Sequence, residues 1–207
     1  MYQTAEFKAG LFEIQDEGAQ LIVDRLHSEP YMKILDYCAG SGGKSLSLAT
    51  QMDNKGLILL HDIRQSALDR AKIRFARHGI QNAKFTTGES LMNRYESRFD
   101  LVIADVPCGG SGTLRRNPEM KLQSCGEFLR KIGKTQTEIL EKSARFLFSK
   151  GVLAYITCSV LEEENQNQID RFLASHRDFE EVHRQLMTPQ SDGHDGFFFS
   201  VLRRRSN

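Results

Sequence analysis

Two cysteines stand at the ends of strand-like segments, where side chains can reach a ligand. Cys108 follows the apolar segment 99–107, and Cys158 ends the segment 151–158. A buried, inert cysteine is the usual fate of this residue type, but small or polar residues follow each of these two. We also expect a helix to begin after Cys158, where the helix dipole favours a thiolate. The pair therefore predicts a nucleophilic centre.

Thiolate chemistry suits the transfer of a methyl group to a pyrimidine ring. Carbon 5 of a pyrimidine is too weak a nucleophile to accept a methyl group directly, but a thiolate that adds to carbon 6 makes carbon 5 nucleophilic. Asp105, just before Cys108 in the sequence, is placed to stabilise this intermediate near the ring nitrogen. A base must then remove the proton from carbon 5 so that the thiol can leave.

A glycine-rich turn is the second candidate site. Residues 36–45, DYCAGSGGKS, end like a nucleotide-binding P-loop, but Cys38 replaces the first glycine of the pattern GxxxxGK[ST], so we set ATP aside. The dinucleotide pattern GxGxxG fails as well, because Ser45 stands where its last glycine belongs. The turn fits S-adenosylmethionine better than NAD.

Acidic residues after the next two strands complete this predicted cofactor site. Asp62 lies at the end of segment 56–63, where it can accept hydrogen bonds from ribose hydroxyls, or instead cap the helix that follows. Glu89 follows segment 83–88 and is placed to touch the adenine or its amino group. A solvated loop acid is the alternative interpretation of Glu89.

Strand-like and helix-like segments alternate along the chain. Apolar runs predict strands at 33–38, 56–63, 83–88, 99–107 and 151–158, and helical patterns cover 12–27, 43–52, 65–79, 122–149 and 162–176. Continuously apolar strands joined by helices are typical of a parallel sheet covered on both faces. The last strands, 179–183 and 196–204, are joined by a loop too short for a helical crossover and should pair antiparallel. The predicted fold is a doubly wound, mostly parallel α/β sheet with a C-terminal antiparallel hairpin.

The overall charge of the chain gives little information about its binding partner, but two segments are strongly charged. The chain has 207 residues, 40% of them hydrophobic, and a net charge of +1, so there is no global charge argument for nucleic acid. Segment 115–150 has nine Lys/Arg against four Glu, and segment 162–181 has seven Asp/Glu against two Arg. The first is a candidate phosphate-binding patch, although two ordinary solvated helix faces explain the charges equally well.

The four cysteines form no CxxC pair, and no His or Cys has metal-ligand spacing, so we expect no metal site. Their wide separation and the lack of a signal peptide predict a reducing cytoplasm. Apolar runs are too short to span a membrane.

Several motifs resemble those of the catalytic domain of the RsmB/Sun-type (NOL/NOP/Sun) RNA cytosine-5 methyltransferases and occur in the same order as in that family. DYCAGSGGK resembles the cofactor loop DxCAAPGGK of that family, with Gly40-Ser41 in place of Ala-Pro. The further matches are GLFEIQDEGAQL (10–21) with the first helix, DVPCGGSGTLRRNP (105–118) with D-A-P-C-S-G-x-G-T, TCSVLEEEN (157–165) with the nucleophile motif, and DGFFFSVL (195–202) with the last strand. Nearly the whole chain is covered.

The resemblance implies a Rossmann-like class I fold that uses S-adenosylmethionine, and a role for each matching residue. Cys158 is the implied nucleophile, and Cys108 the residue that assists breakdown of the covalent intermediate and product release. The implied cofactor site comprises Cys38, Ala39, Gly40, Ser41, Gly42, Gly43, Lys44, Asp62, Glu89 and Asp105, where Glu89 replaces the family's usual Asp. We expect Arg115 and Arg116 to contact RNA phosphates, or else to form salt bridges with the acidic segment 162–181.

The family's members usually carry an extra RNA-binding domain, which residues 1–207 do not include. We therefore expect one catalytic domain, with an N-terminal helical region in 1–30, and predict no protein partner. By analogy with the family, ribosomal RNA is the first substrate expected and transfer RNA the second. A DNA cytosine-5 methyltransferase that attacks through Cys108 is an alternative, as is a non-catalytic RNA-binding or assembly factor with the same fold.

Overall fold

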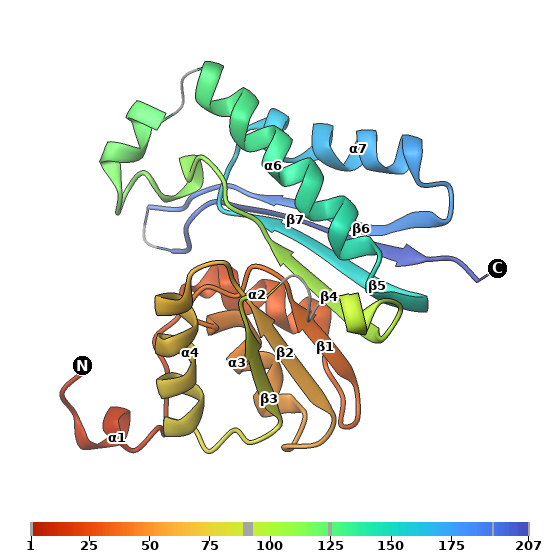
Figure 1. Cartoon of the computed structure of the whole chain (residues 1–207). Helices are drawn as coiled ribbons and strands as arrows, with labels where there is room; N and C mark the ends of the chain where they lie inside the picture. The colour runs from red at the N-terminus through yellow and green to blue at the C-terminus, as the bar shows by residue number, and fades with distance from the viewer. Residues whose placement is uncertain (1, 89–92, 124–125, 192, 207) are drawn as a thin grey trace.

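A central β-sheet organises the chain, as Figure 1 shows. The computed structural model describes residues 2–88, 93–123, 126–191 and 193–206, and within them the sheet has seven strands in the order β3-β2-β1-β4-β5-β7-β6. The strands are β1 (Lys33–Asp36), β2 (Leu57–His61), β3 (Ala83–Thr86), β4 (Phe99–Asp105), β5 (Leu147–Thr157), β6 (Phe179–Met187) and β7 (Phe197–Arg204). Strands β1 to β5 pair parallel, and β7 pairs antiparallel with both β5 and β6. The predicted fold class is confirmed.

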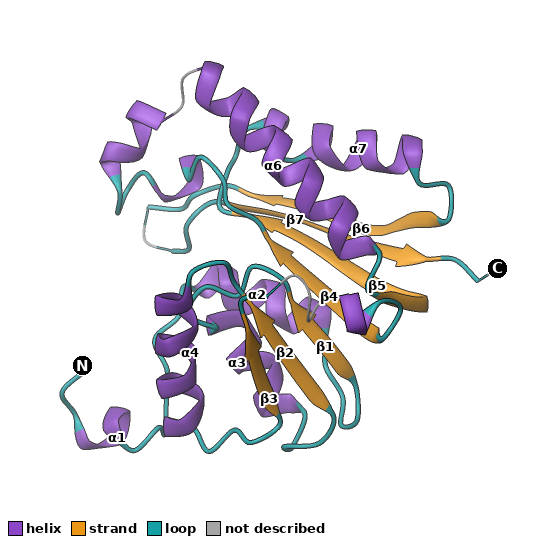
Figure 2. Cartoon of the chain, viewed as in Figure 1, coloured by secondary structure: helices purple, strands orange, loops and turns teal. Residues whose placement is uncertain are grey.

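Helices cover both faces of this sheet and make a three-layer architecture (Figure 2). They are α1 (Ala5–Lys8), α2 (Glu17–Leu26), α3 (Gly43–Gln51), α4 (Gln65–Arg77), α6 (Gly126–Ala144) and α7 (Gln166–Ser175). Short 3-10 helices are η1 (Asn93–Tyr95), η2 (Ser111–Thr113), η3 (Pro118–Gln123) and η4 (Glu162–Glu164). Helices α2, α3 and α4 share one core with the sheet, and α6 and α7 share the other.

The alternation of side chains along each strand explains why both faces are apolar. In β1, Ile34 packs into the core with α2, α3 and α4, whereas its neighbour Leu35 packs into the core with α6 and α7. Strand β4 divides in the same way, with Leu101 and Ile103 on one face and Val102 on the other. Since successive strand residues point to opposite faces, a continuously apolar strand must be buried on both sides.

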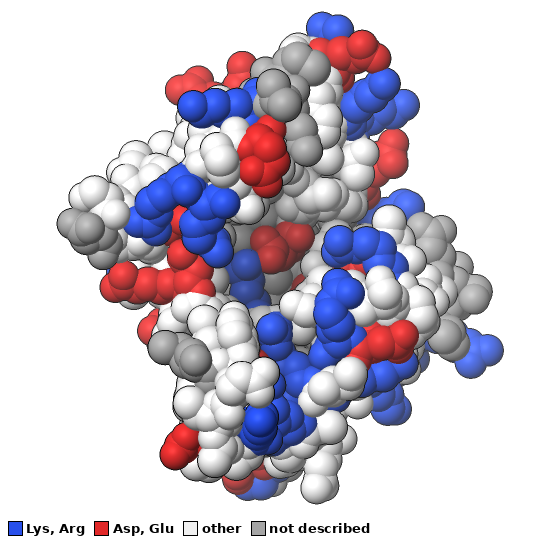
Figure 3. Space-filling model, turned by 90° about the vertical axis from the view of Figure 1, so that its left-hand side faces the viewer, with Lys and Arg blue, Asp and Glu red and all other residues white. Residues whose placement is uncertain are grey.

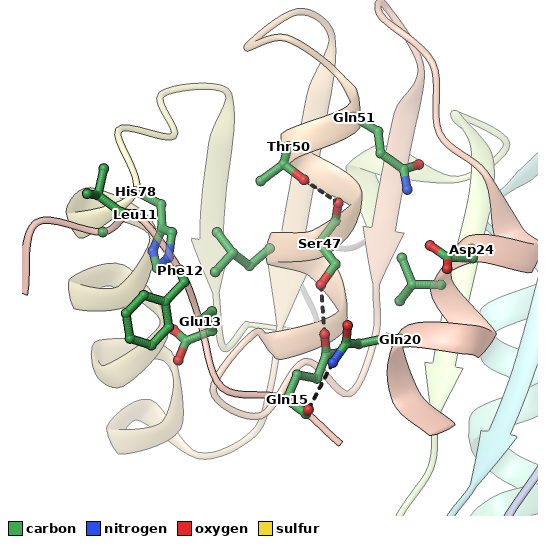
Figure 4. A pocket seen from close by; sticks show the side chains of 13 residues that line it. Leu11, Phe12, Glu13, Gln15, Gln20, Asp24, Ser47, Thr50, Gln51 and His78 are labelled. Carbon is green, nitrogen blue, oxygen red and sulfur yellow. Dashed lines mark hydrogen bonds between the residues drawn. The ribbon is translucent and has the colours of Figure 1, made fainter. Parts of the chain in front are cut away.

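The predicted helix 12–27 is wrong over its first turn. Helix α2 begins at Glu17, because the side chain of Asp16 accepts a hydrogen bond from Gly18 N at 2.8 Å and caps the helix there. The preceding segment runs beside α3, where Gln15 Oε1 accepts from Ser47 Oγ at 2.9 Å (Figure 4). This segment borders a cavity of about 430 Å³ between α2, α3 and α4.

The predicted helical segment 122–149 also ends too late. Helix α6 stops at Ala144, and β5 begins at Leu147, which pairs with Phe99 at the start of β4. Lys150 has a positive φ of 68°, and the register of the β4–β5 pair shifts between Phe99 and Leu101. Backbone pairing with β4 thus extends the strand into residues whose local sequence is compatible with a helix.

Candidate active site

The carboxyl ends of β1, β2, β4 and β5 meet at one edge of the sheet and enclose a cavity. Its volume is about 690 Å³, within the range usual for small-molecule sites. Figure 3 looks onto this edge and shows a hollow with acidic and basic side chains at its floor. The predicted residues that line the cavity are Cys38, Ala39, Gly40, Ser41, Gly43, Lys44, Asp62, Asp105, Cys108 and Cys158.

The glycine turn after β1 presents backbone to this cavity. Gly40 and Gly42 have positive φ angles of 54° and 76°, which favour glycine. At Gly42 a Cβ atom would lie only 2.9 Å from the ring of Phe75, so this glycine lets the turn pack on α4. At Gly40 a Cβ atom would find nothing closer than Arg64, at 3.9 Å, so this part of the turn is open for a ligand.

Asp36, at the end of β1, is a buried carboxyl group beside the cavity. Its Oδ2 accepts a hydrogen bond from Ser45 Oγ at 2.6 Å, whereas its Oδ1 has no partner within the described part of the chain. Burial raises the pKa of Asp36 to about 7, against the hydrogen bond from Ser45. A buried polar atom without a partner is expected where a polar ligand completes the site.

Asp62 holds the turn and is held in place by its neighbour Arg64. Its Oδ2 accepts from Gly40 N at 2.8 Å and from Arg64 Nη2 at 3.0 Å, and its Oδ1 accepts from Arg64 N and Nε at 2.9 and 3.0 Å. Burial opposes the charge, but these bonds lower the pKa of Asp62 overall. The alternative prediction for Asp62 was that it is the N-cap of the next helix. The N-cap of α4 is Arg64, so this alternative is wrong.

The two cysteines lie side by side, as their positions on neighbouring strands predict. The Sγ atoms of Cys108 and Cys158 are 3.1 Å apart, and Cys158 N donates to Cys108 Sγ at 3.3 Å. The hydrogen bond from the Cys108 thiol lowers the pKa of Cys158, and nearby Lys44 acts in the same direction. The same hydrogen bond raises the pKa of Cys108, and burial raises it further. Cys158 is therefore the more acidic thiol of the pair.

A helix dipole does not activate Cys158, contrary to the sequence prediction. The chain after Cys158 runs through η4, and α7 begins only at Gln166. The hydrogen bond from the Cys108 thiol is the main cause that lowers the pKa of Cys158. Lys44 adds positive charge, but its Nζ donates to Asp105 Oδ2 at 2.7 Å and lies 5.6 Å from the ring centre of Phe197, and the charge of Asp105 raises the pKa of Cys158 against Lys44. Although burial opposes its charge, Asp105 raises the pKa of Lys44, which stays protonated.

Several residues at the site carried no recognisable signal in the sequence. Ile63 is 84% exposed at the cavity and offers an apolar surface beside Asp62. On the opposite wall, α6 contributes Thr135, Glu138, Ile139 and Lys142. Behind the cysteines, the buried carboxylate of Glu164 accepts hydrogen bonds from both cysteine loops. A strand-end acid after an apolar segment can be found by pattern, but these residues come from a loop, a helix face and a 3-10 turn.

Arg115 and Arg116 join two loops beside the cavity. Arg115 donates to the carbonyl oxygens of Gln190, Ser191 and Gly193 at 2.7 to 2.9 Å. Arg116 Nε donates to Asp195, a carboxylate that is only 1% exposed, at 2.7 Å. The alternative prediction, that both arginines form salt bridges with the acidic segment 162–181, is therefore wrong, because their carboxylate partner is Asp195. Both guanidinium groups remain about half exposed.

The remaining predictions concern Glu89, Cys38 and metal ions. Glu89 lies outside the described residues. Burial raises the pKa of the Cys38 thiol, so this cysteine lines the cavity in its neutral form. Among the residues that the structure describes, no group of three or more His, Cys, Asp or Glu side chains is arranged to hold a metal ion, and no helix is long and apolar enough to cross a membrane.

Comparison with known proteins identifies the family. Residues 23–203 match the family described as 16S rRNA methyltransferase RsmB/F. The chain belongs to this family. The RsmB/Sun-type resemblance predicted from the motifs is thereby confirmed, and S-adenosylmethionine is the cofactor of these methyltransferases.

Relatives and solved structures agree with the RsmB/F assignment. The chain is 32% identical over 205 residues to ribosomal RNA small subunit methyltransferase B of Proteus mirabilis, covering 96% of this chain and 47% of the relative. It is 30% identical over 223 residues to the probable methyltransferase B of Bacillus subtilis, covering 96% and 49%. A methyltransferase homologue from Pyrococcus horikoshii superposes with a TM-score of 0.85 at 25% identity, covering 99% of this chain and 72% of that one. The chain thus spans about half the length of the curated relatives.

Proposed function

We propose that this chain transfers a methyl group from S-adenosylmethionine to carbon 5 of a cytosine in RNA through a covalent adduct between Cys158 and carbon 6. The observation that carries the proposal is the pair of thiols, 3.1 Å apart, at the wall of a cavity that also holds the ion pair of Lys44 and Asp105. A buried structural cysteine does not require a second thiol within hydrogen-bond distance. An addition–elimination reaction, in contrast, uses one group as the nucleophile and a second group as the base.

The reaction begins with Cys158. Its thiolate adds to carbon 6, which breaks the π bond between carbons 5 and 6, and we assign Asp105 to the ring nitrogen, where the intermediate must be stabilised. Carbon 5 becomes nucleophilic and accepts the methyl group, for which the bound cofactor supplies an electrophilic sulfonium methyl. Loss of the proton from carbon 5 then restores the ring double bond as the bond between Cys158 and carbon 6 breaks.

The role of Cys108 in the second half of the reaction follows from its surroundings. The hydrogen bond to Cys158 and the charge of that sulfur both raise the pKa of Cys108. When Cys158 is bonded to carbon 6, its sulfur carries no charge and is a weaker hydrogen-bond acceptor, so both of these causes weaken. Cys108 can then release its own proton to solvent, and its thiolate can accept the proton from carbon 5. This change supports its assignment to breakdown of the adduct.

The residues of the glycine turn fit the cofactor. The open backbone at Gly40, the unpartnered Oδ1 of Asp36 and the exposed side chain of Ile63 supply polar and apolar surface at one end of the cavity. We assign this end to S-adenosylmethionine, with Asp62 facing the ribose. The cysteines and the α6 wall line the other end, which is left for the cytosine.

RNA is the proposed substrate, with ribosomal RNA of the small subunit first and transfer RNA second. The names of the relatives and the family description support the first choice. The half-exposed guanidinium groups of Arg115 and Arg116 lie beside the cavity and are suited to the phosphates that flank a flipped base.

The test uses the chain with cofactor labelled on its methyl group. Separate reactions contain small-subunit ribosomal RNA, total transfer RNA and duplex DNA, and the products are digested to nucleosides and separated. The proposal expects labelled 5-methylcytidine from RNA and none from DNA. Label in the deoxynucleoside, or in a base other than cytosine, would contradict the proposal. Binding of RNA without any label would favour the assembly-factor alternative.

A further inference from the structure

Behind the cysteine pair lies a carboxylate from the segment TCSVLEEEN (157–165) to which the proposed reaction gives no role. Glu164 in η4 is fully buried, at 0% exposed. Its Oε2 accepts from Gly109 N at 2.7 Å and from Gln136 Nε2 at 2.9 Å, and its Oε1 accepts from Ser159 Oγ at 2.6 Å. All three donors are neutral groups. A buried carboxylate held only by neutral donors is costly for folding, and such groups cluster at functional sites.

The three donors come from the two loops that carry the thiols and from the helix behind them. Gly109 follows Cys108, and Ser159 follows Cys158, so one carboxylate bonds to the residue next to each cysteine. Gln136 of α6 also donates to Pro107 O at 3.0 Å and so ties the first loop to the same carboxylate. We propose that Glu164 is a positioning residue of the two-cysteine centre, joining the Cys108 loop to the Cys158 loop and setting the distance between the two thiols.

Further contacts around Glu164 point the same way. Asn165, its neighbour, accepts from Thr157 Oγ1 at 2.6 Å and donates to Ser159 O at 2.9 Å, which fixes the backbone on both sides of Cys158. The carbonyl oxygen of Glu164 accepts from Tyr155 Oη at 2.7 Å. At Gly109 a Cβ atom would lie 2.9 Å from Glu164 Oε1, so the loop approaches the carboxylate this closely only because residue 109 is glycine.

The negative charge of Glu164 has a second consequence. Besides the hydrogen bond to Cys158 and burial, the charge of Glu164 contributes to the raised pKa of Cys108. The same carboxylate therefore helps to keep the proton on Cys108 and leaves Cys158 as the more acidic thiol. This consequence concerns the free chain and does not depend on RNA. The effect on catalysis, in contrast, rests on the proposed cytosine-5 chemistry.

The test substitutes Glu164→Gln, which keeps the size of the side chain and removes its charge. The matched control is Glu163→Gln, since Glu163 is an exposed residue of the same η4 turn. The alkylation rate of each cysteine by iodoacetamide is measured against pH, with the modified residue identified by mass spectrometry. In Glu164→Gln we expect Cys108 to react at lower pH, with the ratio of Cys108 to Cys158 labelling near pH 8 rising at least about threefold. Glu163→Gln should match the wild type.

Two further variants separate geometry from charge. Glu164→Asp keeps the charge but is one methylene too short to reach both loops, so kcat for methylation should fall about tenfold or more while the KM for RNA stays within about twofold. Ser159→Ala removes a single donor and should shift the labelling ratio less than Glu164→Gln does. It serves as the readout if Glu164→Gln fails to fold.

The proposal is wrong if the labelling profiles of Glu164→Gln and Ser159→Ala both equal that of the wild type, even when their melting temperatures are lower. A kcat of Glu164→Asp equal to that of the wild type would equally overturn the positioning role. Alkylation requires neither cofactor nor RNA. A chain that methylates no RNA at all would therefore refute the proposed function and leave the labelling result to decide the role of Glu164.

Discussion

Cys108 and Cys158 have different surroundings although their sulfur atoms are neighbours. The hydrogen bond from Cys108, with the charge of Lys44, lowers the pKa of Cys158 against burial and the charge of Asp105. The hydrogen bond to Cys158, burial and the charge of Glu164 raise the pKa of Cys108. This asymmetry indicates which thiol is the nucleophile before any substrate is present. It also favours the RNA-type assignment over the DNA-type alternative, in which Cys108 would attack.

The first prediction separates the two thiols. Cys158→Ala has no nucleophile for carbon 6 and should lose all methylation. Cys108→Ala should still form the adduct but release it slowly, because addition and elimination are separate steps with separate catalysts. Incubation with RNA and cofactor followed by denaturing gel electrophoresis should show a trapped RNA complex for Cys108→Ala alone. Trapping in Cys158→Ala, or methylation by it, would overturn the mechanism.

The second prediction concerns Asp62 and the neighbouring arginine. Four donors occupy the carboxylate of Asp62, three of them from Arg64, and a carboxylate offers about four lone-pair sites. A ribose hydroxyl must therefore displace part of the Arg64 side chain. Asp62→Ala should weaken binding of S-adenosylmethionine by about 1–3 kcal/mol, whereas Arg64→Ala should leave it equal or tighter. Calorimetric titration measures both, and unchanged affinity in Asp62→Ala would remove the residue from the cofactor site.

Among the elements, β7 decides how the loops around the active site are held. Because β7 enters the sheet between β5 and β6, the loop that precedes it passes beside η2. Gly196 N donates to Gly112 O at 2.8 Å, and Asp195 accepts hydrogen bonds from Arg115 and Arg116. The two arginines thus have a structural role in addition to the RNA contact proposed for them.

The third prediction distinguishes these two roles. Replacing Arg115 and Arg116 together with Ala should lower the melting temperature, since buried Asp195 loses its donors, and should weaken RNA binding with a shallower dependence on salt. Asp195→Asn should lower the melting temperature without changing the salt slope. Arg203 and Arg205, exposed near the opposite end of β7, provide the control pair. A salt slope in the Arg115/Arg116 variant equal to that of the wild type would limit these residues to the structural role.

At the scale of the whole molecule, stability is coupled to pH through the active site. The pKa of Asp36 is about 7 in the folded chain against a usual value near 3.8, so between these pH values the folded state keeps a proton that the unfolded state has released. The contribution of this carboxyl group to folding stability therefore decreases as pH rises through this range, and it is least favourable above pH 7.

The fourth prediction is that Asp36→Asn removes this dependence. At pH 8 the variant should be more stable than the wild type, with a gain of at most ~4 kcal/mol, and at pH 4 the difference should nearly vanish. Denaturant unfolding at both pH values provides the measurement, with Asp24→Asn on the exposed face of α2 as the control. A difference between Asp36→Asn and wild type that does not change with pH would contradict the raised pKa.

Periodicity and motif order in the sequence determined the architecture and most of the site. Strand ends can be located from apolar runs, and parallel strands bring their carboxyl ends to one edge, so the sequence predicted that Asp62, Asp105 and both cysteines lie there together. Boundaries failed where non-local contacts overrode local preference. The N-terminus of β5 is an example, because pairing with β4 makes residues 147–150 a strand.

Only the tertiary structure decided what the site residues do to one another. The hydrogen bond between the thiols, the covering of Asp62 by Arg64 and the burial of Glu164 depend on distances that are absent from a linear pattern. A side chain's pKa follows from its burial and its neighbours, and residues far apart in the sequence supply both. For this reason the sequence identified two cysteines, but the fold determined which of them is the more acidic.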